Sequence, residues 1–260
     1  MPTSDILILI LVFFLTSFVG VVTGSNSLIT VPAMFQLGVD EKVAIATNMF
    51  GLVFMAIGGA IPFLRQGTIN MRRLSPLIIM TIIGSAIGAA IVGLITNRSI
   101  KVIVTVAMIV IVLFTLVKNN QRPRSIEDEI EKDDKAVPVG SHMIFGFIAT
   151  FLLAIYGGLY SGGYVTVLTA TFIAFFGMSF AESIAATKVI NIFSSSIATA
   201  VFIYQGLVDF RLGVILGVTM FAAAYIGAQF ATRMNEVWLR RIFLSAVLLL
   251  AVKTVVDLAI

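Results

Sequence analysis

Lys188 is the residue of this chain whose type and position point most directly to chemistry. It lies inside an apolar stretch that runs from Ser179 to Tyr204, and the nearest acidic residue of that stretch, Glu182, is six positions away. In a membrane-spanning helix, position 188 would fall near mid-bilayer, where a lysine costs about 2.5–3.5 kcal/mol. Such a cation usually marks a substrate or ion path. The alternative is a lysine that snorkels to an interface or rests on backbone carbonyls.

Polar side chains beside Lys188 could complete a binding site for an anion. Asn191 lies one helical turn after Lys188 and shares its helix face, and Thr187 directly precedes Lys188. A desolvated oxyanion needs a cation and several hydrogen-bond donors, because burying an unpaired anion is prohibitively costly. Lys188 would supply the charge and its neighbours the neutral donors. The alternative role for Asn191 is a hydrogen bond between helices.

The composition of the chain indicates a membrane protein. Of its 260 residues, 59% are hydrophobic and 12% are charged, and the mean hydropathy is +1.09. A hydrocarbon core roughly 30 Å thick requires apolar runs of about 17–25 residues. Eight apolar runs of this kind occur, at 6–22, 43–64, 74–96, 100–117, 143–159, 180–204, 212–232 and 237–258.

Three further features of the composition narrow the class of protein. The net charge of +4 fits a polytopic membrane protein with basic loops better than a nucleic-acid binder. Cysteine is absent, so there is no disulfide framework and no thiolate chemistry. The first apolar run lacks a basic flank and an A-x-A cleavage site, so we expect it to be a retained span rather than a cleaved signal peptide.

The two halves of the chain contain matching sequence, which indicates an internal duplication. Residues 66–72 read QGTINMR, and residues 205–211, 139 positions later, read QGLVDFR. With a shift of one residue, Ala46-Thr47-Asn48 matches Ala186-Thr187-Lys188. Thr47 and Asn48 are therefore the counterparts of Thr187 and Lys188. For Asn48, too, the alternative role is an interhelical hydrogen bond.

The duplication predicts two transmembrane repeats, residues 1–118 and residues 142–260. The segment that joins them, 119–141, is charged, contains two prolines and is too polar to enter lipid. We expect it to be a solvated linker. His142, the only histidine, lies at the membrane edge next to this linker, where we expect no role in the chemistry.

Each repeat begins with an apolar helix, a break of small residues and a shorter apolar segment. The first break is Thr23-Gly24-Ser25-Asn26-Ser27, and the second runs from Gly157 through Ser161-Gly162-Gly163. Lipid offers no partners for free backbone groups, so such breaks survive at membrane depth only where protein or a wet cavity covers them. Interrupted helices at matching positions point to a transporter's binding site, because their N-termini favour anions. The alternative is a glycine-rich kink used only for close packing.

We expect an all-α polytopic membrane protein whose repeats are inverted. Residues 6–37 as one straight helix would measure about 48 Å, too long for one crossing, so a re-entrant hairpin followed by three transmembrane helices fits each repeat better. An odd number of crossings makes the two copies face opposite ways. The positive-inside rule agrees, because the side with Arg65, Arg72 and the linker then holds most basic residues and is cytoplasmic. The alternative is eight plain crossings with parallel copies.

The sequence argues against an enzyme and gives no reason to expect a metal or cofactor. Intramembrane chemistry would need paired carboxylates, a Ser/His arrangement or metal ligands, and the predicted helices hold none of these. No nucleotide-binding loop is present, so primary active transport by this chain alone is not expected. Asp40 and Glu182, near the starts of corresponding helices, could carry protons, but we expect them to cap those helices.

The two breaks and the helical segments that follow them resemble the TauE/SafE family of sulfite exporters, also called the toluene-sulfonate uptake permease family. The resemblance rests on the first break with Pro32, on Ala44-Ile45-Ala46-Thr47-Asn48, and in the second half on Ser161-Gly162-Gly163 and Ala185-Ala186-Thr187-Lys188. It covers nearly the whole chain. One departure concerns the first break, which is often a run of glycines in the family, whereas here Ser25, Asn26 and Ser27 could donate to a substrate directly.

The resemblance implies an inner-membrane secondary transporter that exports sulfur-containing anions such as sulfite or organosulfonates. A small-anion channel and an importer of another organic anion are the alternatives, and a homodimer is left open. Resemblance and residue chemistry together predict one substrate site. Its candidate residues are Lys188, Asn48, Thr47, Thr187, Asn191, Gly24, Ser25, Asn26, Ser27, Ser161, Gly162 and Gly163.

Overall fold

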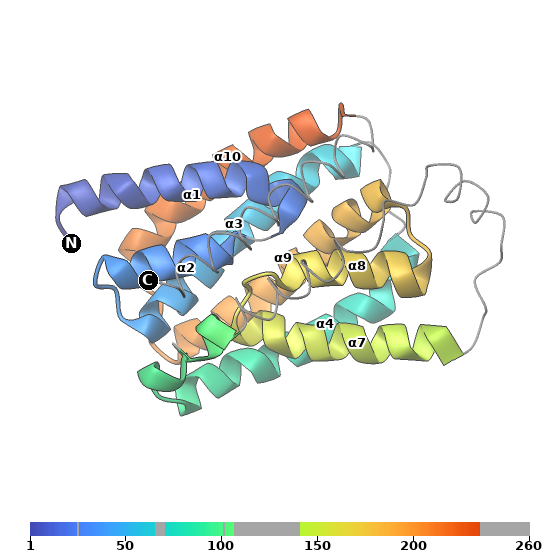
Figure 1. The fold of residues 1–260 in the computed structure, drawn as a ribbon, viewed down its shortest axis with the longest axis horizontal. Coiled ribbons are helices and arrows are strands. Elements are labelled where there is room, and N and C mark those ends of the chain that lie inside the picture. Colours follow the sequence, from blue (N-terminus) through green and yellow to red (C-terminus); the bar gives the residue numbers. More distant parts are fainter. Residues whose placement is uncertain (25, 66–70, 101, 107–140, 235–260) are drawn as a thin grey trace.

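The computed structural model describes residues 1–24, 26–65, 71–100, 102–106 and 141–234. Within these ranges all regular structure is helical (Figure 1). The predicted linker, the run 237–258 and most of the run 100–117 lie outside the described residues. The principal helices are α1 (Thr3–Thr23), α2 (Ser27–Gln36), α3 (Glu41–Arg65), α4 (Met71–Leu94), α7 (Ser141–Leu159), α8 (Tyr164–Phe176), α9 (Phe180–Tyr204) and α10 (Phe210–Ala231).

Five of these helices, α1, α3, α4, α9 and α10, are long and apolar enough to cross a membrane. They confirm five of the predicted apolar runs as candidate spans. The 10 residues of α2 and the 13 residues of α8 would measure only about 15 and 20 Å, so neither reaches across a hydrocarbon core.

The short helices turn back on the helices before them. Figure 1 shows α2 returning alongside α1, and α8 returning alongside α7, and each pair is in contact. The first turn is made at Gly24, whose φ of 71° is the left-handed conformation that glycine tolerates best. Each half of the described chain therefore opens with a helical hairpin.

The second break is shorter than the sequence predicted. We expected it to begin at Gly157, but α7 continues through Leu159 and the break starts at Tyr160. Gly157 and Gly158 stay helical because they are packing positions. A Cβ on Gly158 would lie 2.2 Å from the Ser85 carbonyl oxygen, so α4 approaches α7 through this gap.

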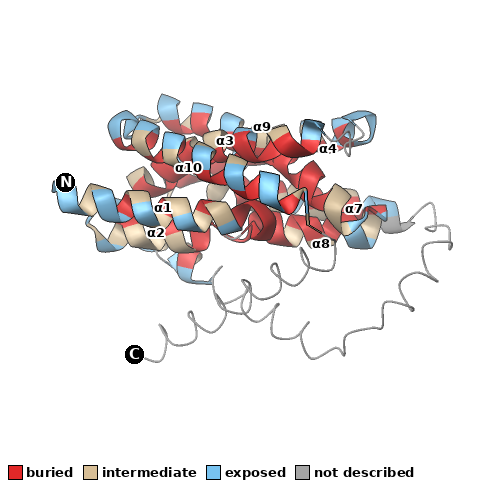
Figure 2. Cartoon of the chain, turned by 90° about the horizontal axis from the view of Figure 1, so that it is seen from above, coloured by how far each residue is buried: buried red, intermediate tan, exposed pale blue. Residues whose placement is uncertain are grey.

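Two long helices, α3 and α9, form the centre of the molecule and pack against each other. In their most apolar windows 72% and 61% of the residues are buried, against 39–44% for the other three candidate spans, which places them inside. Helix α3 packs against α10 and α9 packs against α4, while α1 packs on α10 and α7 packs on α4. Figure 2 shows buried residues gathered between the helices and exposed residues on their outer faces.

Close approach between the outer helices depends on glycine. A Cβ on Gly88 of α4 would lie 1.9 Å from the Ile155 carbonyl oxygen of α7, and one on Gly227 of α10 would lie 2.4 Å from the Phe18 carbonyl oxygen of α1. Both obstacles are backbone atoms, which a side-chain rotation cannot move. Small residues at such contacts let membrane helices come close enough to gain packing energy.

Gly88→Ala should therefore destabilise the protein, by about 1–3 kcal/mol as for other overpacked cores. The measurement is the thermal unfolding midpoint of the detergent-purified protein. Ala90→Val is the matched control, because it adds carbon atoms to an exposed position of the same helix. Equal midpoints for the two variants would contradict the close α4–α7 contact.

Candidate functional site

Lys188 lies in the interior of the bundle rather than at its ends. Its side chain is 3% exposed, and no hydrogen bond or ion pair of its ammonium group occurs within the described part of the chain. The lysine stem passes beside Gly59 of α3, where a Cβ would lie 3.7 Å from Lys188 Cδ, an ordinary contact distance. The Ser179 hydroxyl caps the start of α9 by accepting from the Glu182 N–H at 3.2 Å.

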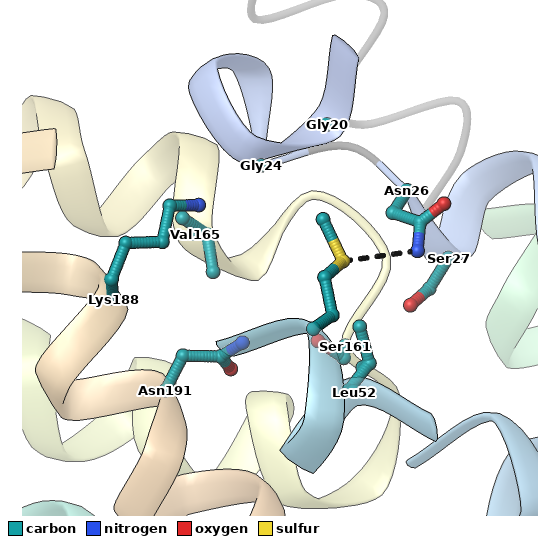
Figure 3. Close-up of a pocket in the computed structure, with 10 residues that line it drawn as sticks. Gly20, Gly24, Asn26, Ser27, Leu52, Ser161, Val165, Lys188 and Asn191 are labelled. Carbon is teal, nitrogen blue, oxygen red and sulfur yellow. Dashed lines mark hydrogen bonds between the residues drawn. The ribbon is translucent and has the colours of Figure 1, made fainter. Parts of the chain in front are cut away.

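A small cavity lies in front of Lys188 and is bordered by both helix breaks. Figure 3 shows Lys188 and Asn191 pointing from one side toward Asn26 and Ser27 on the other. Its free volume is about 10 Å³, about what one water molecule requires. The lining residues are Gly20, Gly24, Asn26, Ser27, Leu52, Met55, Ser161, Val165, Lys188 and Asn191.

The tips of the two hairpins are hydrogen-bonded to each other. The Thr166 hydroxyl of α8 donates to the Thr23 carbonyl at 2.7 Å, and the Tyr160 hydroxyl donates to the Ser27 carbonyl at 3.0 Å. A Cβ on Gly24 would lie 2.6 Å from Val165 Cβ, so only glycine fits where the tips meet. The second hairpin thus supplies donors for two backbone carbonyls of the first.

The electrostatics of the cavity favour an anion. Helix α2 begins at Ser27 and α8 begins at Tyr164, next to the lining residues of each break. The N-terminus of a helix carries free N–H groups and a positive partial charge equivalent to roughly half an elementary charge. No aspartate or glutamate lines the cavity, so the Lys188 cation is not neutralised there.

Met55 occupies the part of the cavity next to the Asn26 side chain. The Asn26 side-chain Nδ2 donates to the Met55 sulfur at 3.3 Å, the dashed line in Figure 3, and to the Ser17 hydroxyl at 3.4 Å. The Met55 methyl group also fits against Gly20, where a Cβ would lie 3.2 Å from it. A thioether is a weak acceptor, so a ligand oxygen would be a stronger partner for Asn26.

The structure brings some of the predicted site residues together at the cavity and places others elsewhere. Ser25 lies outside the described residues. Those at the cavity are Lys188, Asn191, Gly24, Asn26, Ser27 and Ser161, and those that do not line it are Asn48, Thr47, Thr187, Gly162 and Gly163.

Each of the residues away from the cavity has a local role. The Thr47 hydroxyl accepts from the Asp209 N–H at 3.0 Å, and the Thr187 hydroxyl donates to its own helix at Ile184, at 2.9 Å. The Gly162 carbonyl accepts from the Tyr156 hydroxyl, and Gly163, with a φ of 74°, precedes the first turn of α8. Asn48 bonds to α2.

The two carboxylates considered for proton coupling lie at helix starts, away from the cavity. Asp40 accepts from the Lys42 and Val43 N–H groups at 3.0 and 3.3 Å, which is the capping role the sequence suggested. Glu182 lies in the first turn of α9 and pairs with Arg73 at 3.4 Å. Among the described residues, no group of three or more metal-ligating side chains occurs.

Comparison with known proteins gives the family. The sequence model of the sulfite exporter TauE/SafE family matches residues 9–254, nearly the whole chain. The chain belongs to this family. It is therefore a membrane transporter and not an enzyme.

Similar TauE/SafE relatives are full-length matches at low identity. The "Probable membrane transporter protein ORF9" of Sinorhizobium sp is 22% identical over 94% of this chain and 90% of its own length. A "Probable membrane transporter protein" of Haemophilus influenzae is 24% identical over 96% of this chain and 94% of its own length. The "Probable membrane transporter protein YfcA" of Escherichia coli K12 is 23% identical over 96% of this chain and 89% of its own length. No solved structure matches the chain.

Sequence reasoning missed several residues around the cavity of this TauE/SafE protein. Gly20, Leu52, Met55 and Val165 line it, and none carries a charge or a motif that separates it from ordinary helix packing. One signal was available for Gly20, which lies one turn before Gly24 on the same helix face.

Single cysteines test the cavity, because the chain contains none. Ser161→Cys should react with the anionic thiol reagent methanethiosulfonate ethylsulfonate about tenfold faster than with its cationic trimethylammonium analogue, because the local potential is positive. Lys188→Met should remove this preference. Ser4→Cys, exposed at the start of α1 and outside the cavity, is the control and should show a smaller preference that Lys188→Met does not change. A faster reaction of Ser161→Cys with the cationic reagent would contradict the electrostatics described here.

Proposed function

We propose that this protein is a secondary transporter that moves sulfur-containing anions such as sulfite or organosulfonates across the inner membrane, in the outward direction. The observation that carries the proposal is the buried Lys188 ammonium group, unpaired within the described residues, in a cavity bordered by two helix N-termini. A sulfonate group presents three oxygens. Lys188, Asn26, Ser27 and the N–H groups of α8 are donors that match such a group.

The cavity is too small in the described conformation to hold the proposed substrate. A free volume of about 10 Å³ accommodates roughly one water, so a sulfite ion would need additional space. Two movements would supply it: departure of the Met55 side chain from Asn26, and separation of the hairpin tips at Thr166 and Tyr160. Together these two movements would break three hydrogen bonds, which join Asn26 to Met55, Thr166 to Thr23 and Tyr160 to Ser27.

The helix directions support an inverted repeat as the basis of alternating access. In Figure 1, α1 and α3 run from left to right, whereas their counterparts α7 and α9 run from right to left. The packing is also reciprocal, because α3 contacts α10 as α9 contacts α4, and Gly88 meets α7 as Gly227 meets α1. Transporters with inverted repeats expose one midplane site to the two sides in turn.

The inverted arrangement predicts that corresponding helix ends face opposite sides of the membrane. Leu64→Cys at the end of α3 and Tyr204→Cys at the end of α9 should be labelled by a membrane-impermeant thiol reagent from opposite sides. In right-side-out cells or vesicles only one of the two should react, and permeabilisation should be needed for the other. Labelling of both from one side would favour parallel repeats. With the linker cytoplasmic, Leu64→Cys should be the protected position.

A channel for small anions and an importer of another organic anion are the competing functions. A channel needs a continuous water-filled path, whereas the described cavity has room for about one water. Counterflow in proteoliposomes separates the two classes, because only a carrier exchanges labelled for unlabelled anion against the net gradient. Loading the anion on either side of the membrane then tests whether transport is outward or inward.

The two carboxylates considered for proton coupling do not border the cavity. Coupling of transport to protons through Asp40 or Glu182 would therefore have to act at a distance.

The decisive experiment is ligand-dependent thermal stabilisation of the purified protein. Sulfite or methanesulfonate at about 100 times its dissociation constant should stabilise the parent by about 2.7 kcal/mol, and Lys188→Met should abolish the effect. Arg72→Met is the matched control, since it removes a cation from an exposed position outside the cavity. Stabilisation by chloride or taurine alone would remove sulfur oxyanions as the substrate class. An unchanged response in Lys188→Met would remove the site.

A further inference from the structure

Met55 fills space between two polar sides of the cavity. Figure 3 shows Lys188 and Asn191 on one side and Asn26 and Ser27 on the other. The Met55 sulfur, at one end of the dashed line, lies between these two pairs. The side chain is 5% exposed. Shortening it would therefore open space inside the bundle, next to the polar residues, rather than on the outer surface.

The contacts of Met55 with the first hairpin hold its side chain only weakly. Its sulfur accepts from Asn26 Nδ2 at 3.3 Å, and a Cβ on Gly20 would lie 3.2 Å from its methyl carbon Cε. A thioether is a weak acceptor, and an unbranched methionine side chain adapts to irregular gaps. Met55 can thus turn away from Asn26 while it stays in the interior.

Helix α3 contributes only apolar side chains to the described lining of the cavity. These are Leu52 and Met55, which lie one turn apart, whereas the polar lining residues belong to α9 and to the two breaks. An anionic group held near Lys188 leaves the α3 side for the rest of a substrate molecule. An alkyl substituent forms no hydrogen bonds, so this apolar side is where its burial is favourable.

The other two apolar side chains at the cavity are less able to make room. Val165 is β-branched and stiff, and its Cβ would lie 2.6 Å from a Cβ on Gly24, where the hairpin tips meet. Leu52 is 3% exposed and branched. Met55 is therefore the side chain whose position and size decide how much space a substituent finds.

We propose that Met55 is a specificity-determining residue that limits the length of the substituent carried by an anionic substrate. This inference rests on the proposed anion-transport function and adds the size of the substrate. A short substituent requires Met55 only to turn aside. A longer one would need the space that Met55 still occupies inside the bundle, and an overpacked interior is destabilised.

A series of linear alkanesulfonates measures this limit, because methane-, ethane-, propane- and butanesulfonate differ only in chain length. Apparent dissociation constants come from the unfolding midpoint of the purified protein over a range of ligand concentrations. In the parent protein, propanesulfonate should bind about tenfold more weakly than methanesulfonate. In Met55→Ala, affinity should instead rise about fourfold per added methylene, until the added carbons have replaced Cγ, Sδ and Cε.

Met220→Ala is the matched control. Met220 is fully buried where α10 packs on α3, beside Gly51, and it does not line the cavity. The substitution removes the same atoms from the same bundle, so it should lower the unfolding midpoint and leave the dependence on chain length as in the parent. If Met55→Ala showed the parent's dependence, or if Met220→Ala changed it equally, the proposal would be overturned.

A double variant separates a substrate site from an apolar hole. The sulfonate group remains the part that Lys188 holds, so adding Lys188→Met to Met55→Ala should abolish binding at every chain length. If Lys188→Met abolished binding in the parent background but the longer sulfonates still bound to the double variant, the new space would be unrelated to the anion site. That result would also overturn the proposal.

Met55→Val keeps the test conclusive if Met55→Ala does not fold, because it leaves a smaller gap. It should shift the preferred chain length in the same direction, by less. If methanesulfonate stabilises the parent and no folded Met55 variant changes the dependence on chain length, this inference fails alone. If neither sulfite nor any alkanesulfonate stabilises the parent or the Met55 variants, the proposed function fails and this inference with it.

Discussion

The structure depends on one constraint, which is that two helices stop in the middle of an apolar bundle and must satisfy their backbone there. Lipid cannot do so, and the second hairpin supplies partners for the first. The Thr166 hydroxyl donates to the Thr23 carbonyl and the Tyr160 hydroxyl donates to the Ser27 carbonyl, so hydrogen bonds join the two hairpin tips. The same contact brings the N-termini of α2 and α8 to one cavity. Positive dipole ends then lie near Lys188, an arrangement that the proposed anionic substrate would compensate.

Rigid and movable parts of the bundle differ in how they are held. Helices α3 and α9 are the most buried spans, and glycines allow α4 and α10 to approach α7 and α1 to backbone contact. Such packing resists deformation, because its obstacles are main-chain atoms. The hairpin tips are held by a few hydrogen bonds around a small cavity. The proposed transport would use this division, since the proposed site would open while the surrounding helices keep their packing.

Helices α3 and α9 carry different polar side chains near the hairpins. Lys188 of α9 lines the cavity, whereas Asn48 of α3 does not line it and hydrogen-bonds to Ser27 and Thr30 of α2.

By itself the sequence determined the membrane class, the family, the positions of five candidate spans, both breaks to within a few residues, and Lys188 as the buried cation. These follow from local properties, since hydropathy and glycine content act over one helix at a time. The tertiary structure alone decided which polar residues meet. Asn26, Ser27, Ser161 and Asn191 reach the cavity, whereas Thr47 and Thr187 turn to other partners, and Met55 enters it unforeseen. Helical periodicity assigns each residue to a face of its own helix. Which face meets the cavity depends on how α3, α9 and the two hairpins pack together. That packing brings together residues more than a hundred positions apart in the chain, such as Tyr160 and Ser27.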